Sequence, residues 1–210
     1  MSTDDDASTP AHALISIATQ CTADYVHEIV PMVSRWRSRV SVAVLAIQSV
    51  ALTHHAIARL RACSVDVMRF VDFHIVLADG PDVYTDFKAG ASSSKSYMKL
   101  VEESSLISSV SCEDMLSKGV GSVMVVTDRY ANKGVDVPTN ALRNVARQYI
   151  RTPHVLVLDC DLVPSNGLAY EYERVVSEYG NSVEGKERDM TKVAFVIPGV
   201  WCVLIVSYYE

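Results

Sequence analysis

Short apolar runs with few polar positions recur along this chain and constrain its fold more than any other feature. Residues 40–47, 120–127 and 154–158 are rich in branched aliphatic side chains and lack the regular polar alternation of a half-exposed strand. Strands of this kind are typical of a sheet that is covered on both faces. The sequence therefore predicts buried strands between layers of helices.

Helical patterns separate these runs. Residues 23–37 and 51–62 are expected to be helices, and residues 139–151 form the clearest amphipathic helix in the chain. The remaining elements expected from the pattern are strands at 13–18, 71–77 and 193–197, and helices within 97–118 and at 167–179. Strands that alternate with helices predict an α/β fold with a mostly parallel sheet.

Length and charge narrow the class of protein. The 210 residues, 49% of them hydrophobic, are enough to bury one sizeable core. We expect a lead-in without structure over residues 1–12, one domain over residues 13–198 and an atypical apolar tail over residues 199–210. The net charge of -6 does not favour a nucleic-acid partner. The sequence leaves the oligomeric state open, as a monomer, homo-oligomer or hetero-oligomer.

The five cysteines and the two chain ends carry weaker signals. No two cysteines have C-x-x-C spacing, so a zinc site is not expected, and their odd number favours buried thiols over a disulfide framework. The first ten residues are acidic and polar, unlike a signal peptide or an N-terminal membrane anchor. Residues 193–206 are apolar but shorter than a usual span of ~20 residues, which favours a buried strand.

Two aspartates directly follow the apolar run at 154–158. In extended chain, residues two apart share a face, so Asp159 and Asp161 are expected to converge while Cys160 turns into the core. Carboxylates brought together need a cation or a proton, and Mg²⁺ or Mn²⁺ suits such oxygen ligands. The carboxyl ends of parallel strands are also where ligands bind.

The D-x-D pattern by itself does not choose a function. A solvated turn after a strand is an equally good interpretation, and some phosphotransferases and phosphatases also carry D-x-D after a strand. A Gly-rich phosphate loop, which P-loop enzymes would need, is absent. That absence counts against a P-loop enzyme. The D-x-D pattern alone still leaves metal binding, a plain turn and phosphoryl transfer open.

The helix expected before the aspartates has two distinct faces. Leu142, Val145, Ala146, Tyr149 and Ile150 form its apolar stripe. Asn140, Arg143 and Asn144 lie on the other side near the helix N-terminus, where the backbone N–H groups favour an anion. We expect Arg143 and Asn144 to face a diphosphate or a sugar, although a solvated basic face is the alternative.

Two adjoining segments resemble glycosyltransferase family 49, the family of the LARGE catalytic domain. They are V-P-T-N-A-L-R-N-V-A-R from residue 137, and T-P-H-V-L-V-L-D-C-D-L-V-P-S-N-G-L from residue 152. The segments L-I-S-I-A-T-Q from residue 14 and K-V-A-F-V-I-P from residue 192 extend the resemblance, in order, over residues 13–198. Val137 departs from the aromatic residue that the family prefers.

The resemblance implies a GT-A-like (Rossmann-like) fold, a UDP-sugar donor, Mn²⁺ and a glycan or glycoprotein acceptor. It also implies that the protein is located in the Golgi membrane. It implies glucuronic acid, or a related hexose, as the transferred sugar. By position, it assigns Asp159 and Asp161 to the metal and the donor diphosphate. It assigns Thr19 and Gln20, with Asn140, Arg143 and Asn144, to the donor site.

The chain departs from the family after Pro198, where it reads G-V-W-C-V-L-I-V-S-Y-Y-E instead of turning into an A-F-E segment. From this departure we expect a C-terminally incomplete fold that lacks part of the acceptor site. A catalytically inactive binding or scaffold fragment is therefore the alternative to an active transferase.

Overall fold

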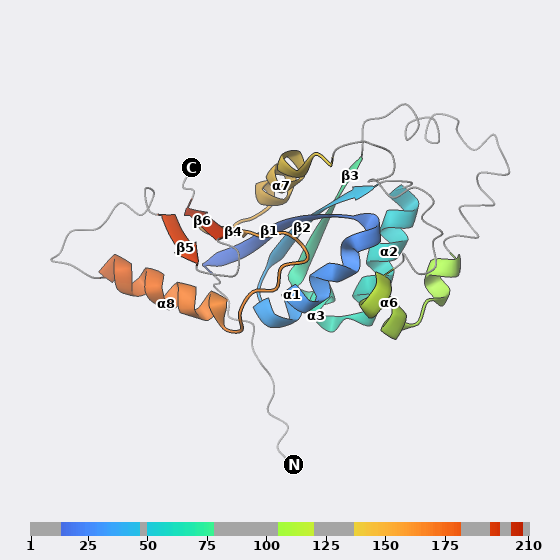
Figure 1. Cartoon of the computed structure of the whole chain (residues 1–210), viewed down its shortest axis with the longest axis horizontal. Helices are drawn as coiled ribbons and strands as arrows, with labels where there is room; N and C mark the ends of the chain where they lie inside the picture. The colour runs from blue at the N-terminus through green and yellow to red at the C-terminus, as the bar shows by residue number, and fades with distance from the viewer. Residues whose placement is uncertain are drawn as a thin grey trace, which may run out of the picture.

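The computed structural model describes residues 14–46, 50–77, 105–119, 137–181, 194–197 and 203–207. These residues build a six-stranded sheet between layers of helices (Figure 1). The strands are β1 (Ile15–Thr22), β2 (Val40–Ala46), β3 (Val71–Leu77), β4 (His154–Val157), β5 (Ala194–Ile197) and β6 (Val203–Ser207). Their order in the sheet is β3-β2-β1-β4-β6-β5.

Four of the strands are parallel and two are antiparallel. β2 pairs with β1 and β3, and β4 pairs with the other side of β1, all in parallel. β6 then runs antiparallel to β4, and β5 runs antiparallel to β6. The predicted α/β, mostly parallel sheet is therefore confirmed, with an antiparallel pair added at one edge.

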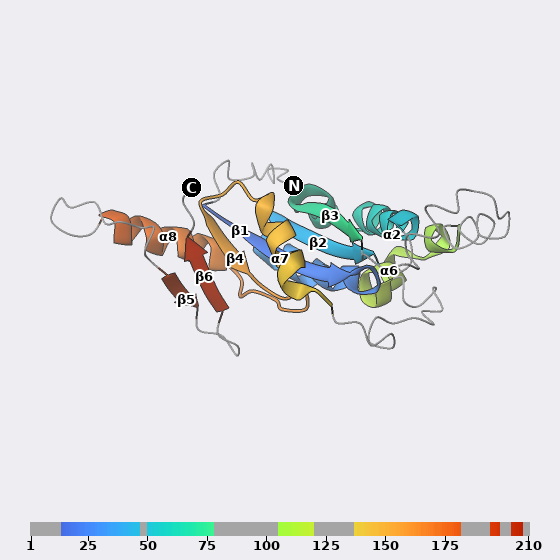
Figure 2. The same ribbon diagram turned by 90° about the horizontal axis from the view of Figure 1, so that it is seen from above.

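Helices cover both faces of the sheet, as the apolar runs predicted. The face that we call the broad face is covered by η1 (Ala23–Glu28), α1 (Ile29–Trp36), α2 (Val50–Cys63), α3 (Val65–Phe70), α6 (Cys112–Lys118) and α8 (Leu168–Asn181). α7 (Thr139–Gln148) lies across the opposite face, which we call the α7 face (Figures 1 and 2). β1 and β2, at the centre, are buried along almost their whole length.

Side chains on the strands alternate between the two faces. On β1, Ile15, Ile17 and Cys21 belong to the broad core, whereas Ala18 packs beneath α7. The core beneath α7 consists of Ala18, Ala43, Leu45, Leu142, Ala146 and Val155. The central strands look uniformly apolar because both of their faces are covered.

Several expectations differ from the structure in detail. The expected helix at 23–37 opens as a 3-10 helix, and the short helix α3 was not predicted. The expected strand at 193–197 is confirmed as β5, but the apolar run that continues to residue 206 is not a single strand, because it also supplies β6, which is antiparallel to β5. The expected tail at 199–210 accordingly supplies β6, which lies between β4 and β5 in the sheet. The lead-in at 1–12 and the expected strand at 120–127 lie outside the described residues.

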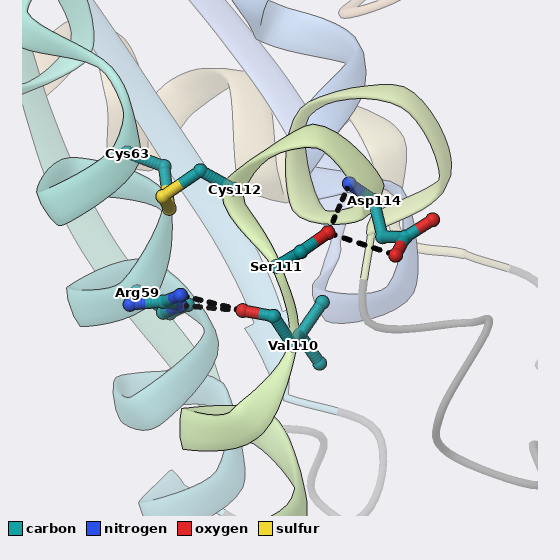
Figure 3. Close-up of a disulfide and its surroundings, with 6 residues drawn as sticks. All are labelled: Arg59, Cys63, Val110, Ser111, Cys112 and Asp114. Atoms are coloured by element: carbon teal, nitrogen blue, oxygen red, sulfur yellow. Dashed lines mark hydrogen bonds between the residues drawn. A yellow bond between two sulfur atoms is a disulfide. The ribbon is translucent and has the colours of Figure 1, made fainter.

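The expectation that the cysteines are all buried thiols is wrong for one pair. Cys63, at the end of α2, forms a disulfide with Cys112, at the start of α6 (Figure 3). Nearby, Arg59 donates two hydrogen bonds, of 3.1 and 2.5 Å, to the carbonyl oxygen of Val110. The pairing could not be predicted from spacing, because 49 residues separate the two cysteines.

The helices that the structure describes do not include a membrane-spanning segment. None of them combines the length and the apolar character that a span of the bilayer requires.

Candidate functional site

The predicted site residues gather where the strand order of the sheet reverses. From β1 the chain proceeds outward to β2 and β3, and it then returns to place β4 on the other side of β1. Gln20 lies near the carboxyl end of β1, and Asp159 follows β4 by two residues. In open α/β sheets, this crevice between diverging connections is the usual place for a ligand.

Three of the predicted side chains contact one another at this point. The Gln20 side-chain amide donates a hydrogen bond of 2.8 Å from Nε2 to Oδ1 of Asp159. Arg143, from α7, donates from Nη2 to the same oxygen at 2.6 Å and from Nε to Oε1 of Gln20 at 3.2 Å. We call this arrangement the Gln20–Arg143–Asp159 cluster, and it ties α7 to the carboxyl ends of β1 and β4.

The cluster sets the charge state of Asp159. Partial burial raises the pKa of the Asp159 carboxyl, but hydrogen bonds from Gln20 and Arg143 and the charge of Arg143 outweigh it. The resulting pKa of Asp159 lies below the usual value for an aspartate. Asp159 is therefore a carboxylate at neutral pH, and Gln20 and Arg143 hold it in place.

Asp159 and Asp161 lie in a turn and not in the extended chain that the sequence predicted. β4 ends at Val157, and the amide of Leu162 donates a hydrogen bond of 3.0 Å to the carbonyl oxygen of Asp159. Both aspartates are exposed. The side chain of Asp161 forms no hydrogen bond or ion pair with another residue that the structure describes. Asp161 is therefore available to a ligand from solvent.

Cys160, between the two aspartates, packs against the broad core as the sequence predicted. There it meets Cys21 of β1, which is buried. The hydrogen bond with Cys160, together with burial, raises the pKa of the Cys21 thiol well above its usual value. Cys21 is therefore a protonated thiol at neutral pH. This contact was not predicted from the sequence, because it depends on the register between β1 and β4, which a single sequence does not fix.

The other predicted donor residues are not part of the cluster. Thr19 is fully buried, alternates with Gln20 along β1, and has a hydroxyl without a hydrogen-bond partner in the described part of the chain. Its side chain therefore faces away from the cluster. Asn140 and Asn144 are exposed on α7, and their side chains contact none of the three cluster residues through a hydrogen bond. His154 starts β4, at the opposite end of the strand from the aspartates.

The side chains at the site could hold a hard cation, such as Mg²⁺ or Mn²⁺, only together with oxygen atoms from a bound ligand or water. Over the ranges that the structure describes, no three His, Cys, Asp or Glu side chains gather as a metal site would require. Mg²⁺ and Mn²⁺, however, are commonly bound by one or two carboxylates together with substrate phosphates and water. Asp159 and Asp161 are carboxylates of the kind such a site needs, and because Oδ1 of Asp159 accepts hydrogen bonds from Gln20 and Arg143, its other oxygen and Asp161 are the groups that could bind the ion.

A hollow of about 550 Å³ lies elsewhere on the molecule. It is lined by Ser34, Arg35, Arg37 and Asn166, beside the end of α1 that precedes β2. None of the predicted site residues lines this hollow.

Two comparisons with known proteins show what the chain is similar to. A family model described as "Glycosyl-transferase for dystroglycan" matches residues 14–200. The chain is also similar to "Beta-1,4-glucuronyltransferase 1" from Danio rerio, with 26% identity over 168 residues. That alignment covers 75% of this chain and 34% of the relative, so the chain spans about a third of the length of the relative it matches.

Proposed function

The chain belongs to the family described as glycosyl-transferase for dystroglycan, and on that premise we propose that it forms the donor-binding part of a transferase that moves a sugar from a UDP-sugar to a glycan acceptor. The observation that carries the proposal is the Gln20–Arg143–Asp159 cluster at the point where the strand order reverses. A carboxylate, a guanidinium and an amide held there suit the charged and polar groups of a nucleotide diphosphate.

We further propose that Asp159 and Asp161 would hold Mn²⁺, with Mg²⁺ as a possible substitute. When bound, the ion would supply positive charge to stabilise the diphosphate that leaves the sugar. The residues of the chain have separate tasks in this scheme. Arg143 keeps Asp159 ionised and oriented, while Asp161 is exposed and open to a ligand. Asn140 and Asn144, exposed on the same helix as Arg143, are proposed to contact the donor.

The choice of sugar and the compartment are finer proposals. We propose glucuronic acid as the transferred sugar, since the name of the zebrafish relative states that activity for that relative. We propose the Golgi membrane as the location, with this domain on the luminal side. The Cys63–Cys112 disulfide supports it, because such bonds persist in oxidising compartments and are rare in the cytosol.

Donor binding is tested by the thermal unfolding of the chain with UDP and Mn²⁺. A ligand that binds only the folded state at a hundred times its Kd stabilises it by about 2.7 kcal/mol, so the melting temperature should rise. Asp161→Asn should remove this rise. Asp72→Asn is the matched control, because Asp72 is an exposed aspartate on β3, towards the amino end of the strand. A full shift in the Asp161 variant would contradict the metal role, and no shift in the wild-type chain would contradict donor binding.

The alternative is a chain that binds the donor without transferring its sugar. It is favoured by the sparse donor set, because the described residues supply only two carboxylates at the proposed site. Release of UDP from UDP-glucuronate, measured with and without a glycan acceptor, separates the two functions. An active transferase releases UDP faster when the acceptor is present, and a binding fragment does not.

A further inference from the structure

Two free thiols lie at the aspartate turn, one within the turn and one near the end of β1. Cys21 is near the end of β1 and only 6% exposed, and Cys160 is the half-buried residue between Asp159 and Asp161. Both side chains pack against the broad core. The site described above makes no use of either thiol.

The pairing of β1 with β4 brings these two residues together. Ala18 is the register partner of Val157, and the amide of Leu158 continues the ladder with a hydrogen bond of 3.2 Å to the carbonyl oxygen of Ala18. Gln20 and Asp159 are then joined through their side chains. Cys21 and Cys160 are the next residue on each segment, and both side chains pack in the broad core.

The same register suits a covalent bond. Where the turn begins, Leu158 is still hydrogen-bonded to Ala18, and neighbouring strands lie about 4.8 Å apart, within the range of about 4.4–6.8 Å between Cα atoms that disulfides join. The two cysteines also point to the same side of the sheet. A bond between them therefore needs a small movement of the turn and no rearrangement of the strands.

We propose that Cys21 and Cys160 are a site of reversible oxidation, at which a disulfide would fasten the aspartate turn to β1 and weaken donor binding. The effect on the donor rests on the function proposed above, whereas the formation of the bond does not. The bond would draw the two sulfur atoms to about 2.05 Å, closer than thiols in non-bonded contact. Residues 159–161 would move with Cys160, which would disturb the hydrogen bond between Gln20 and Asp159.

Oxidised glutathione is an oxidant of the required class. The sulfur of Cys160, which is partly exposed, attacks one glutathione sulfur, and the glutathione disulfide breaks to release one reduced glutathione. The sulfur of Cys21 then attacks Cys160 in the mixed disulfide, and a second reduced glutathione leaves. The two protein thiols lose two electrons and two protons, and one glutathione disulfide becomes two thiols.

The formation of the bond is tested by peptide mapping of the full chain after equilibration with oxidised or reduced glutathione. A Cys202→Ser background removes the fifth cysteine of the sequence, so that it cannot form mixed links with the pair. A linked Cys21–Cys160 peptide is expected only in the oxidised sample, and it should be absent in both Cys160→Ser and Cys160→Ala. The Cys63–Cys112 peptide is the internal control for a folded chain. Failure to find the Cys21–Cys160 link in a chain that keeps the Cys63–Cys112 link would overturn the proposal.

The effect on the site is tested with the same samples by titration with UDP and Mn²⁺. Oxidation should weaken binding several-fold, and reduction should restore it, whereas the Cys160→Ser variant should respond to neither treatment. Equal affinity of the linked and reduced forms would overturn the regulatory part. If the reduced chain does not bind UDP, the donor proposal fails while the linked peptide still reports on the thiol pair.

Discussion

The two faces of the sheet differ in what holds them to their helices. The broad face carries a large apolar core together with the Cys63–Cys112 disulfide. The α7 face has a much smaller apolar core, centred on Leu142 and Ala146 of the helix. Polar contacts between the helix and the strands supplement it, chiefly the Gln20–Arg143–Asp159 cluster.

A second group of polar contacts also links α7 to the strands beneath it. The hydroxyl of Ser41, on β2, donates a hydrogen bond of 2.7 Å to the carbonyl oxygen of Ala146 and lies 2.9 Å from Nε2 of His74. The ring of Tyr149 stacks on His74, with the ring centres 4.1 Å apart. Charged and polar groups on this face form the candidate site, whereas the broad face supplies most of the buried apolar surface. We infer that stability and chemistry are largely assigned to opposite faces.

If the broad face supplies most of the stability, the largest loss of stability should follow removal of its disulfide. Replacing both Cys63 and Cys112 by Ser should lower the free energy of unfolding by about 2–4 kcal/mol, because the bond restricts the unfolded chain across 49 residues. Urea unfolding of the variant and the wild type measures this loss. UDP binding by the variant at low temperature should be unchanged, since neither cysteine is part of the Gln20–Arg143–Asp159 cluster.

Reduction of the wild type is the matched control for the disulfide variant. Dithiothreitol should lower the stability of the wild type to that of the double variant and leave the variant itself unaffected. A double variant as stable as the oxidised wild type would show that the broad face depends on its apolar core alone.

On the α7 face, Arg143→Met should give the opposite result, with a small loss of stability and a large loss of function. The Arg143–Asp159 pair is substantially exposed, with 35% and 51% of the two side chains accessible, and exposed ion pairs contribute about 0–1 kcal/mol. The pKa of Asp159 should rise towards its usual value, because the guanidinium that favours the carboxylate is gone. Carboxyl NMR titration measures the pKa, and calorimetry with UDP and Mn²⁺ measures the loss of binding.

Arg147→Met, one helical turn further along α7, is the control for the removal of a positive charge. It should leave both the pKa of Asp159 and donor binding nearly unchanged, because Arg147 is exposed and outside the cluster. Equal losses of binding in the two variants would contradict a specific role for Arg143 and indicate a general effect of charge.

The sequence predicted the broad outline of this division but not its details. Uniformly apolar strands such as 40–47 indicated a sheet covered on both sides, and the helix with Arg143 was identified with its apolar stripe. Tyr149 was expected in that stripe but is 59% exposed, because its ring lies flat on His74 at the edge. Local periodicity could not anticipate this contact, which depends on β3 lying beside β2.

The candidate site shows the same limit. Gln20, Arg143 and Asp159 were all named from the sequence, but their mutual hydrogen bonds depend on the register between β1 and β4, which a single sequence does not fix. Thr19 was named beside Gln20, yet strand alternation sends it to the other face. The position of β6 between β4 and β5 required long-range pairing and could not be predicted from its composition.

The smallest predicted effect is on the pH dependence of stability. It is tested on one histidine from each face of the sheet. Burial lowers the pKa of His154, which contacts Tyr172 on the broad face. Burial also lowers the pKa of His74, beneath α7, but the charge of Asp72 partly opposes this shift. Below the usual histidine pKa of about 6.5, the unfolded chain binds protons that the folded chain does not, so stability should fall as the pH decreases.

His154→Gln should therefore reduce the dependence of stability on pH between about 7.5 and 5.5 more than His74→Gln does. Burial acts unopposed on His154, whereas Asp72 favours the charged form of His74. Asp159 does not interfere over this range, because its pKa lies below the usual aspartate value and it stays ionised. Urea unfolding at the two pH values measures the difference for each variant. A larger reduction in the His74 variant would mean that the α7 face excludes water better than the broad face, contrary to the division of roles inferred from the packing.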